Sequence, residues 1–200
     1  MKLKKGFYIR DNVVQIAKDL LGKILVTKID GKISSGIIVE TEAYNGIYDK
    51  ACHAYGGRKT DRTKVMYEEG GISYVYFCYG MHYLFNVVTN KKEVPDAVLI
   101  RGIVPLKNKK CIFQRISEKS LKNGILNGPG KVTKAMGIDK SFNGVSLLGN
   151  QIWIEDDGIL IPKGDILIGP RVGVDYAGED ALLPYRFLVK NFETLMKSYK

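Results

Sequence analysis

Strand-like segments dominate the first half of the chain, and the clearest of them form a closely spaced pair. KILVTKI (23–29) and KISSGIIVE (32–40) flank the dipeptide Asp30-Gly31. Asp-Gly between two runs rich in β-branched residues is typical of the two-residue turn of a β-hairpin, because both turn positions need a positive φ. Two strands joined this closely pair antiparallel, and the rest of the fold must accommodate that pair.

The following segments extend this pattern. SYVYFCYGMHYLFNVV (73–88) indicates two strands that bend at Gly80, and AVLIRGIVP (97–105) indicates another strand, after a long Gly-rich loop over 45–71. The spacing of apolar residues predicts helices over 13–21, capped by Asp11, over 107–118 and over 129–137, and short strands from there to about residue 189. Strands in direct succession favour an α+β, β-rich and mostly antiparallel architecture. The length of 200 residues fits a single compact domain over residues 1–200.

The charge of the chain points to a phosphate-rich partner. Lys and Arg number 31 against 21 Asp and Glu, a formal charge of +10. Such a surface favours nucleic acid through counterion release, although a generic solubility surface carries the same charge. No apolar run approaches the roughly 18 residues of a spanning helix, and no secretory signal is apparent. The three scattered cysteines argue against a disulfide framework and fit a reducing cytoplasm.

Two glutamates follow directly on the apolar run Ile37-Ile38-Val39. In a regular strand, Glu40, Glu42 and Tyr44 share one face. This position at the margin of the core would raise a carboxyl pKa by partial desolvation, whereas a nearby cation would lower it. Such a carboxylate suits a general base or a group that stabilises developing positive charge. Neither role follows if both glutamates face solvent.

One arginine, Arg101, lies inside the apolar strand AVLIRGI (97–103). An arginine is seldom buried without a partner, and Glu40 or Glu42 would supply the carboxylate. Exposure of Arg101 at the end of the strand is the alternative.

The run YVYFCYGMHYLF (74–85) is half Tyr and Phe, and most of these side chains suit a strand core. Tyr79 differs because it stands next to Gly80 at the tip of the expected hairpin, where burial is hardest. An exposed aromatic residue at a tip, in a basic protein, suits stacking on bases or insertion between base steps.

Two Gly-rich segments carry positive charge. GGRKTDRTK (56–64) contains the cations Arg58, Lys59, Arg62 and Lys64. NGPGK (127–131) places Lys131 where a helix opens, a geometry that can bind phosphate through backbone N–H groups, although it is equally a plain helix start. It is no Walker A loop, because Ile125 and Val132 stand where that pattern needs Gly and Ser or Thr. Cys52-His53 and Cys78 with His82 lack the C-x-x-C pattern of zinc sites, so no metal is expected.

Together these segments resemble the alkyladenine (3-methyladenine) DNA glycosylase family over about residues 6–190. The motifs that carry the resemblance, in order, are VETEAY (39–44), AYGGRKT (54–60), YVYFCYGMHYLFNV (74–87), LIRG (99–102), NGPGK (127–131) and GPRVGV (169–174). The resemblance implies a compact domain with a curved antiparallel sheet, open and barrel-like, surrounded by helices. It also implies a monofunctional glycosylase that flips alkylated or deaminated purines from duplex DNA and hydrolyses the N-glycosidic bond.

The resemblance assigns a role to each matching residue. Glu42 corresponds to the catalytic base that activates water, and Arg101 to the arginine that helps hold that water. The matching pocket residues are Tyr44 and His53, which sandwich the flipped base, Tyr76, which closes the pocket edge, and Asn86, which disfavours the amino group of guanine. Tyr79 corresponds to the residue inserted into the minor groove. We expect the basic residues Arg58, Lys59, Arg62 and Lys131 to contact the DNA backbone.

The resemblance implies no cofactor, no catalytic metal and no lysine that forms a Schiff base. The expected partner is double-stranded DNA with a damaged purine, bound by a monomer without membrane association, in the cytoplasm and at the nucleoid if the source is bacterial. The alternative is a non-catalytic nucleic-acid-binding module of the same fold.

Overall fold

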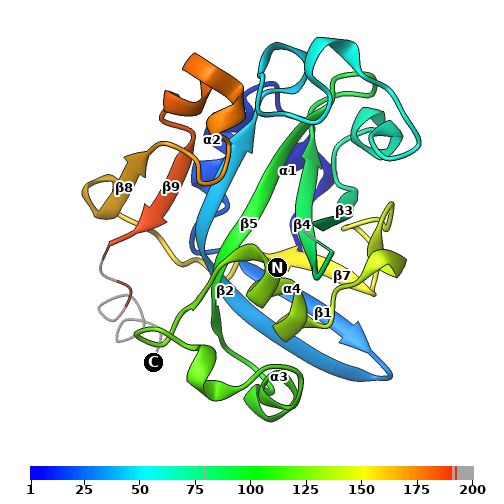
Figure 1. The fold of residues 1–200 in the computed structure, drawn as a ribbon. Coiled ribbons are helices and arrows are strands. Elements are labelled where there is room, and N and C mark those ends of the chain that lie inside the picture. Colours follow the sequence, from blue (N-terminus) through cyan, green and yellow to red (C-terminus); the bar gives the residue numbers. More distant parts are fainter. Residues whose placement is uncertain (79, 191, 193–200) are drawn as a thin grey trace.

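The structure, a computed structural model, describes residues 1–78, 80–190 and 192. Its framework is a nine-stranded sheet that curls into a half-barrel, and every strand pairing among these residues is antiparallel (Figure 1). The strands are β1 (Ile24–Ile29), β2 (Lys32–Tyr44), β3 (Ser73–Cys78), β4 (His82–Thr89), β5 (Asp96–Pro105), β6 (Leu126–Asn127), β7 (Ile152–Glu155), β8 (Ile166–Gly169) and β9 (Arg186–Val189). The predicted α+β fold with a curved, mostly antiparallel, open barrel-like sheet is confirmed.

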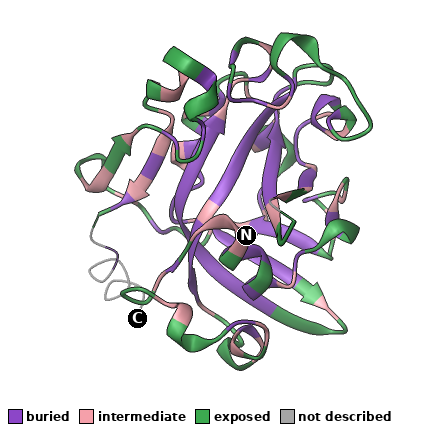
Figure 2. Cartoon of the chain, viewed as in Figure 1, coloured by how far each residue is buried: buried purple, intermediate pink, exposed green. Residues whose placement is uncertain are grey.

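Strand β2 is the centre of this sheet. The main path of the sheet runs β3-β4-β5-β2-β1-β7, and β6 pairs with β5 outside this path. On one edge β2 pairs with β5, and on the other it pairs first with β1 and then, over Glu40–Glu42, with β9. Every residue from Ser34 to Ala43 is buried, which Figure 2 shows as a continuous purple band. Residues 40–42 therefore lie between neighbours on both sides.

Two bulges interrupt the pairing of β2 with β5. The register runs Ile38 to Ile103, Glu40 to Gly102, and then Thr41 to Ile100. Val39 is thus an extra residue on β2, and Arg101 is an extra residue on β5. Bulges re-aim side chains and increase the local twist, and these two lie beside the predicted catalytic residues.

Two hairpins predicted from turn residues are present. Asp30 (φ 49°) and Gly31 (φ 75°) join β1 to β2 in the left-handed conformation that this two-residue turn requires. Strands β3 and β4 pair from Ser73 opposite Val87 to Cys78 opposite His82, and Gly80 has a φ of 67° in the connection.

The helices are α1 (Lys5–Tyr8), α2 (Val13–Asp19), α3 (Lys109–Arg115) and α4 (Pro129–Met136). Three of them confirm predicted helices with shorter bounds, whereas α1 was not predicted. Asp11 is not the cap of α2. Asn12 is the cap, because its side chain accepts a hydrogen bond from the backbone N–H of Gln15, three residues on. The expected loop over 45–71 contains only short 3₁₀ turns.

The core has a main part and smaller satellites. One satellite joins Cys52, Ala54, Met66, Tyr67, Tyr74, Val88 and Ala97, with Tyr44 and Tyr76 packed against it. This cluster attaches the loop after β2 to strands β3, β4 and β5. All three cysteines are free. No helix among the described residues is long and apolar enough to cross a membrane.

Candidate functional site

A cavity of about 660 Å³ opens where the sheet meets the loop after β2, the β3–β4 hairpin, the start of α4 and the segment around Val172. This volume is typical of sites for small organic groups. The predicted residues that line it are Tyr44, His53, Arg62, Tyr76, Asn86, Arg101 and Lys131. The fold thus gathers side chains from five separate segments at one opening.

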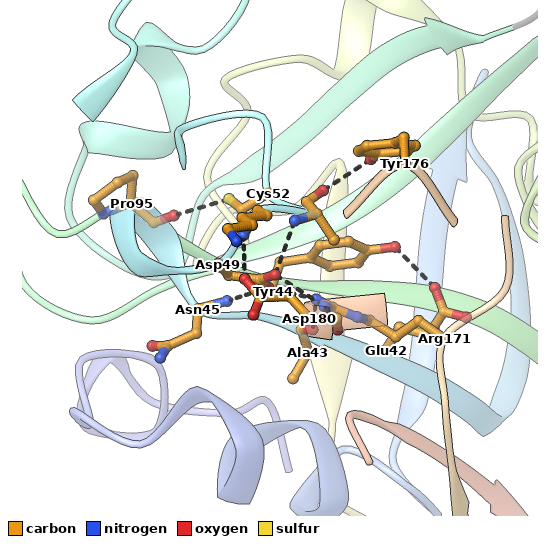
Figure 3. Close-up of polar contacts among 12 residues, drawn as sticks. Glu42, Ala43, Tyr44, Asn45, Asp49, Cys52, Pro95, Arg171, Tyr176 and Asp180 are labelled. Carbon is orange, nitrogen blue, oxygen red and sulfur yellow. Dashed lines mark hydrogen bonds and ion pairs between the residues drawn. The ribbon is translucent and has the colours of Figure 1, made fainter. Parts of the chain in front are cut away.

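Glu42 is not itself among the residues that line this cavity. It is fully buried, and three donors, each from a residue that does line the cavity, surround its carboxylate. The Tyr44 hydroxyl donates to Oε2 at 2.9 Å (Figure 3). The Val172 backbone N–H donates to Oε1 at 2.9 Å. Arg101 Nε lies 3.4 Å from Oε1. The possibility that the two glutamates face solvent is excluded, because Glu40 is fully buried as well.

Burial dominates the electrostatics of Glu42. Desolvation raises the pKa of its carboxyl, opposed by Arg101, by the Val172 N–H and by the Tyr44 hydroxyl, whereas Glu40 adds to the rise. A raised pKa makes a carboxylate a stronger proton acceptor near neutral pH. The arrangement therefore suits a general base.

Arg101 contacts both candidate carboxylates. Its Nε donates to Glu40 Oε1 at 3.0 Å and lies 3.4 Å from Glu42 Oε1. Glu40 Oε1 also accepts from Arg186 Nε at 2.7 Å. The prediction of a partner for Arg101 named Glu40 or Glu42, and the structure brings both to it, together with a second arginine from β9.

A buried ion pair packs against the Tyr44 ring. Arg171 donates from both terminal nitrogens to Asp49, with 2.8 Å between Nη2 and Oδ1, and Nη1 also donates to the Ala43 carbonyl at 3.0 Å (Figure 3). The Arg171 guanidinium lies 4.9 Å from the centre of the Tyr44 ring. Burial and the nearby Glu42 raise the pKa of Tyr44, so its hydroxyl keeps the proton that it donates to Glu42.

His53 is held by aromatic neighbours. Its Nδ1 lies 2.9 Å from the Tyr74 hydroxyl, and its ring centre lies 4.6 Å from that of Tyr76 with the planes at 75°. Burial, together with Arg62 and Arg58, lowers the pKa of His53 to about 4, so the ring is neutral near pH 7. A neutral, edge-packed ring in the lining of the cavity that Tyr44 also lines suits contact with a planar base.

This lowered pKa predicts a pH dependence of stability. Between its ordinary pKa of 6.5 and about 4, His53 takes up a proton in the unfolded chain but not in the folded one. Its contribution to stability is therefore complete above pH 6.5 and is lost as the pH falls towards 4. We expect the free energy of unfolding in urea to fall more steeply between pH 7 and pH 4.5 for wild type than for His53→Asn.

Asp96 acts in the opposite direction in this window, because burial raises its pKa from 3.8 to about 6. Both proteins contain Asp96, so its effect cancels in the difference between wild type and variant. Parallel pH profiles of the two proteins would contradict the neutral, buried state of His53.

Two further predicted pocket residues have defined surroundings. Asn86 is buried, and its Nδ2 donates to the Tyr74 carbonyl at 3.1 Å. The Arg62 guanidinium lies 4.9 Å from the centre of the Tyr76 ring, and its Nη2 lies 3.4 Å from His53 Nε2. Arg62 was predicted at the DNA backbone, and the structure places it at the cavity wall, against two pocket rings.

The remaining basic residues lie on exposed segments. Arg58 is exposed, Lys59 pairs with Glu93 at 2.7 Å, and the exposed Lys131 donates to the Ser120 carbonyl at 3.3 Å. NGPGK does begin a helix, α4, at Pro129. Tyr79, predicted to insert into DNA, lies outside the described residues.

Gly130 in this segment permits a close approach to the β3–β4 hairpin. A Cβ at Gly130 would lie 2.7 Å from Cγ of His82, so a larger residue there would force the ring away. The start of α4 and the first residue of β4 are thereby packed against each other at the cavity mouth.

Sequence reasoning missed four residues of the site: Asp49, Arg171, Val172 and Arg186. Val172 and Arg186 contact Glu42 and Glu40 from segments far along the chain. Arg171 lies against the Tyr44 ring, and Asp49 pairs with Arg171. Arg171 and Val172 belong to the motif GPRVGV, which was noted without a role, and no local pattern marks Arg186. Within the described part of the chain, no three His, Cys, Asp or Glu side chains are grouped so as to hold a metal ion.

Comparison with known proteins gives a consistent result. A family described as "Methylpurine-DNA glycosylase (MPG)" matches residues 6–193. A protein of Chlamydia felis is 50% identical over 188 residues, which cover 94% of this chain and 95% of the relative. One of Clostridium novyi is 45% identical over 204 residues, covering 98% of each. Both relatives bear the name "Putative 3-methyladenine DNA glycosylase".

Proposed function

The chain belongs to the methylpurine-DNA glycosylase family, and from this premise we propose how it acts. Membership makes it a DNA glycosylase of base excision repair, a hydrolase of N-glycosyl bonds. We propose that it is monofunctional: it flips an alkylated or deaminated purine out of duplex DNA and hydrolyses the bond to the sugar with a water molecule, leaving an abasic site.

The observation that carries this proposal is the position of Glu42. A fully buried carboxylate touches two residues that line the cavity, Tyr44 and Arg101, at 2.9 Å and 3.4 Å. A non-catalytic nucleic-acid-binding module gains nothing from a carboxylate beside a phosphate-rich ligand. A hydrolase needs one close to the carbon under attack.

The proposed chemistry uses one water molecule. Glu42 takes a proton from that water, whose oxygen bonds to C1′ as the bond between C1′ and the purine nitrogen breaks, with its electron pair leaving on the base. Positive charge builds on the sugar during this step, as in other glycoside hydrolysis, and the Glu42 carboxylate stabilises it. Arg101 helps to hold the water. Each carboxylate oxygen has two lone pairs, so the contacts from Tyr44 and Val172 leave room for Glu42 to accept the hydrogen bond from the water.

The cavity walls supply the surfaces that a flipped purine needs. We propose that Tyr44 and His53 sandwich the base, that Tyr76 closes the edge and that Asn86 disfavours the amino group of guanine. Tyr79 fills the gap left in the duplex. Flipping costs a few kcal/mol, and least for damaged or mispaired bases, so selection begins before chemistry.

Positive charge provides the affinity for the duplex. The formal charge of +10 favours phosphate contact through counterion release. We propose that Arg58, Lys59, Arg62 and Lys131 contact the backbone around the cavity mouth. We also propose that the protein acts as a monomer on lesion-containing DNA, in the cytoplasm and at the nucleoid if the source is bacterial.

The test uses an end-labelled duplex with one hypoxanthine or one alkylated adenine. Incubation with wild type in the presence of chelator, followed by hot alkali, should break the strand at the lesion only. Omission of the alkali should leave the strand intact, because a monofunctional enzyme has no lyase step. Tight binding without a break on either lesion would contradict the proposal and favour the binding module.

A further inference from the structure

We infer that Glu40 is a positioning residue for the hydrolysis: it holds the Arg101 guanidinium by Nε and so keeps Arg101 from closing onto Glu42. This inference rests on the proposed function, because it assigns Glu40 a task in the water step. In this inference Glu40 does not contact the substrate and acts through Arg101.

The distances show which carboxylate holds Arg101. Arg101 Nε donates to Glu40 Oε1 at 3.0 Å, within hydrogen-bonding range, and lies 3.4 Å from Glu42 Oε1, at the limit of an ordinary bond. The same nitrogen thus faces two acceptors and is bonded to the one that carries no catalytic task. Among the described residues, no hydrogen bond occupies the terminal nitrogens of Arg101, which lines the cavity.

The bulges explain how one nitrogen reaches both glutamates. Arg101 is the extra residue on β5 between the positions opposite Glu40 and Thr41. Its side chain therefore projects between Glu40 and Glu42 and not opposite one of them. Gly102 fits the same arrangement, because a Cβ there would lie 3.0 Å from the Glu40 Cβ.

Arg186 places a second cation against the Glu40 carboxylate. Arg186 Nε donates to Glu40 Oε1 at 2.7 Å from the opposite edge of β2. Two carboxylates and two guanidiniums then form one cluster with balanced charge. Without Glu40, the cluster would hold two cations and only Glu42 to pair with them.

One oxygen of Glu40 is buried in a way that packing alone does not favour. Its Oε2 is buried and has no hydrogen-bond partner among the described residues, while both donors meet at Oε1. A buried carboxylate oxygen without a donor lowers stability. Such a cost is common where a residue serves a functional arrangement.

The charges that face Glu42 set the expected pH effect. They are Glu40 and the Tyr44 hydroxyl on β2, Arg101 on β5, Arg186 on β9, and Arg171 beside the Val172 N–H. Glu40 raises the pKa of Glu42 and Arg101 lowers it. Loss of Glu40 removes the first influence and strengthens the second, so Glu42 becomes a weaker base.

The experiment measures single-turnover excision on a lesion duplex from pH 5 to pH 9. It compares wild type, Glu40→Gln and the double variant Glu40→Met with Arg186→Met. The amide keeps an acceptor for Arg101 but loses the charge, whereas the double variant removes the pair as a unit and leaves no uncompensated cation from Arg186. Glu69→Gln, on the surface beside Lys5, is the matched control.

We expect the double variant to lose about 10–100-fold in the plateau rate, the size of effect that misplacement of a catalytic group produces. The acidic limb of its pH–rate profile should move to lower pH, while its affinity for the lesion duplex stays at the wild-type value. Glu40→Gln should lose less in rate and shift the limb in the same direction. Glu69→Gln should match wild type.

The inference is overturned if the double variant keeps the wild-type acidic limb, or if its whole loss lies in affinity for the duplex. Should that variant fail to fold, the limb of Glu40→Gln decides in the same way. Failure of wild type to excise either lesion is a separate result, which contradicts the proposed function and leaves no water step for Glu40 to serve.

Discussion

The Glu42→Gln variant is expected to lose base excision, with a single-turnover rate about 10²–10⁴-fold below that of wild type, the range that a general base supplies. The amide has the size of the carboxylate, and its oxygen can still accept from the Val172 N–H, which lies 2.9 Å from Oε1. The fold and the cavity therefore remain. On the proposed mechanism, the variant loses the group that accepts the proton of water and the charge that stabilises the sugar.

Three measurements separate this effect from a structural one. The affinity for lesion duplex and the unfolding midpoint should equal those of wild type, and only the rate should fall. Glu69→Gln again serves as the control, because it makes the same chemical change on the surface. Excision at the wild-type rate by Glu42→Gln would remove Glu42 from the role of base.

Replacement of Arg171 by Met is expected to lower the free energy of unfolding by about 3–5 kcal/mol, because it leaves a buried carboxylate without its cation. The side chains of Arg171 and Asp49 are 0% and 1% exposed. Arg171 also donates to the carbonyl oxygens of Ala43 and Asp180, so its loss frees three segments from one another. Urea unfolding at pH 7 measures the effect.

Two further variants serve as controls for the effect of Arg171→Met. Arg171→Met combined with Asp49→Leu should recover part of the loss, since removal of a buried pair as a unit leaves no isolated charge. Asp61→Asn breaks an exposed pair with Lys64 and should leave the unfolding midpoint unchanged. If Arg171→Met destabilises no more than Asp61→Asn, the ion pair is not a support of the fold.

Local turn chemistry explains why so much of the sheet could be predicted. Asp30-Gly31 and Gly80 mark connections whose backbone few other residues adopt, and Pro105 marks the end of a strand. The bulges at Val39 and Arg101 could not be predicted, because they depend on how two strands far apart in the sequence align. The cap of α2 was misplaced by one residue for a simpler reason: Asp and Asn stand side by side.

Sequence patterns placed the residues of β2 that belong to the candidate site, but they did not reveal the distant residues that contact them. Alternation along one strand correctly placed Glu40, Glu42 and Tyr44 on one face, which their shared contacts with Arg101 and with each other show. Arg171 and Arg186 act over distances of more than 100 residues along the chain. No periodicity or spacing encodes such pairs, so only the folded structure reveals them.

The late position of β9 in the chain has a consequence for the order of synthesis. Arg186 meets Glu40 across 146 residues, and the Val172 N–H meets Glu42 across 130. A ribosome releases the chain from its N-terminus, so the strand that carries both glutamates emerges long before its partners. The nascent protein can thus form the β1–β2 hairpin early, but the contacts that surround Glu40 and Glu42 are complete only after residues 172 and 186 have been synthesised.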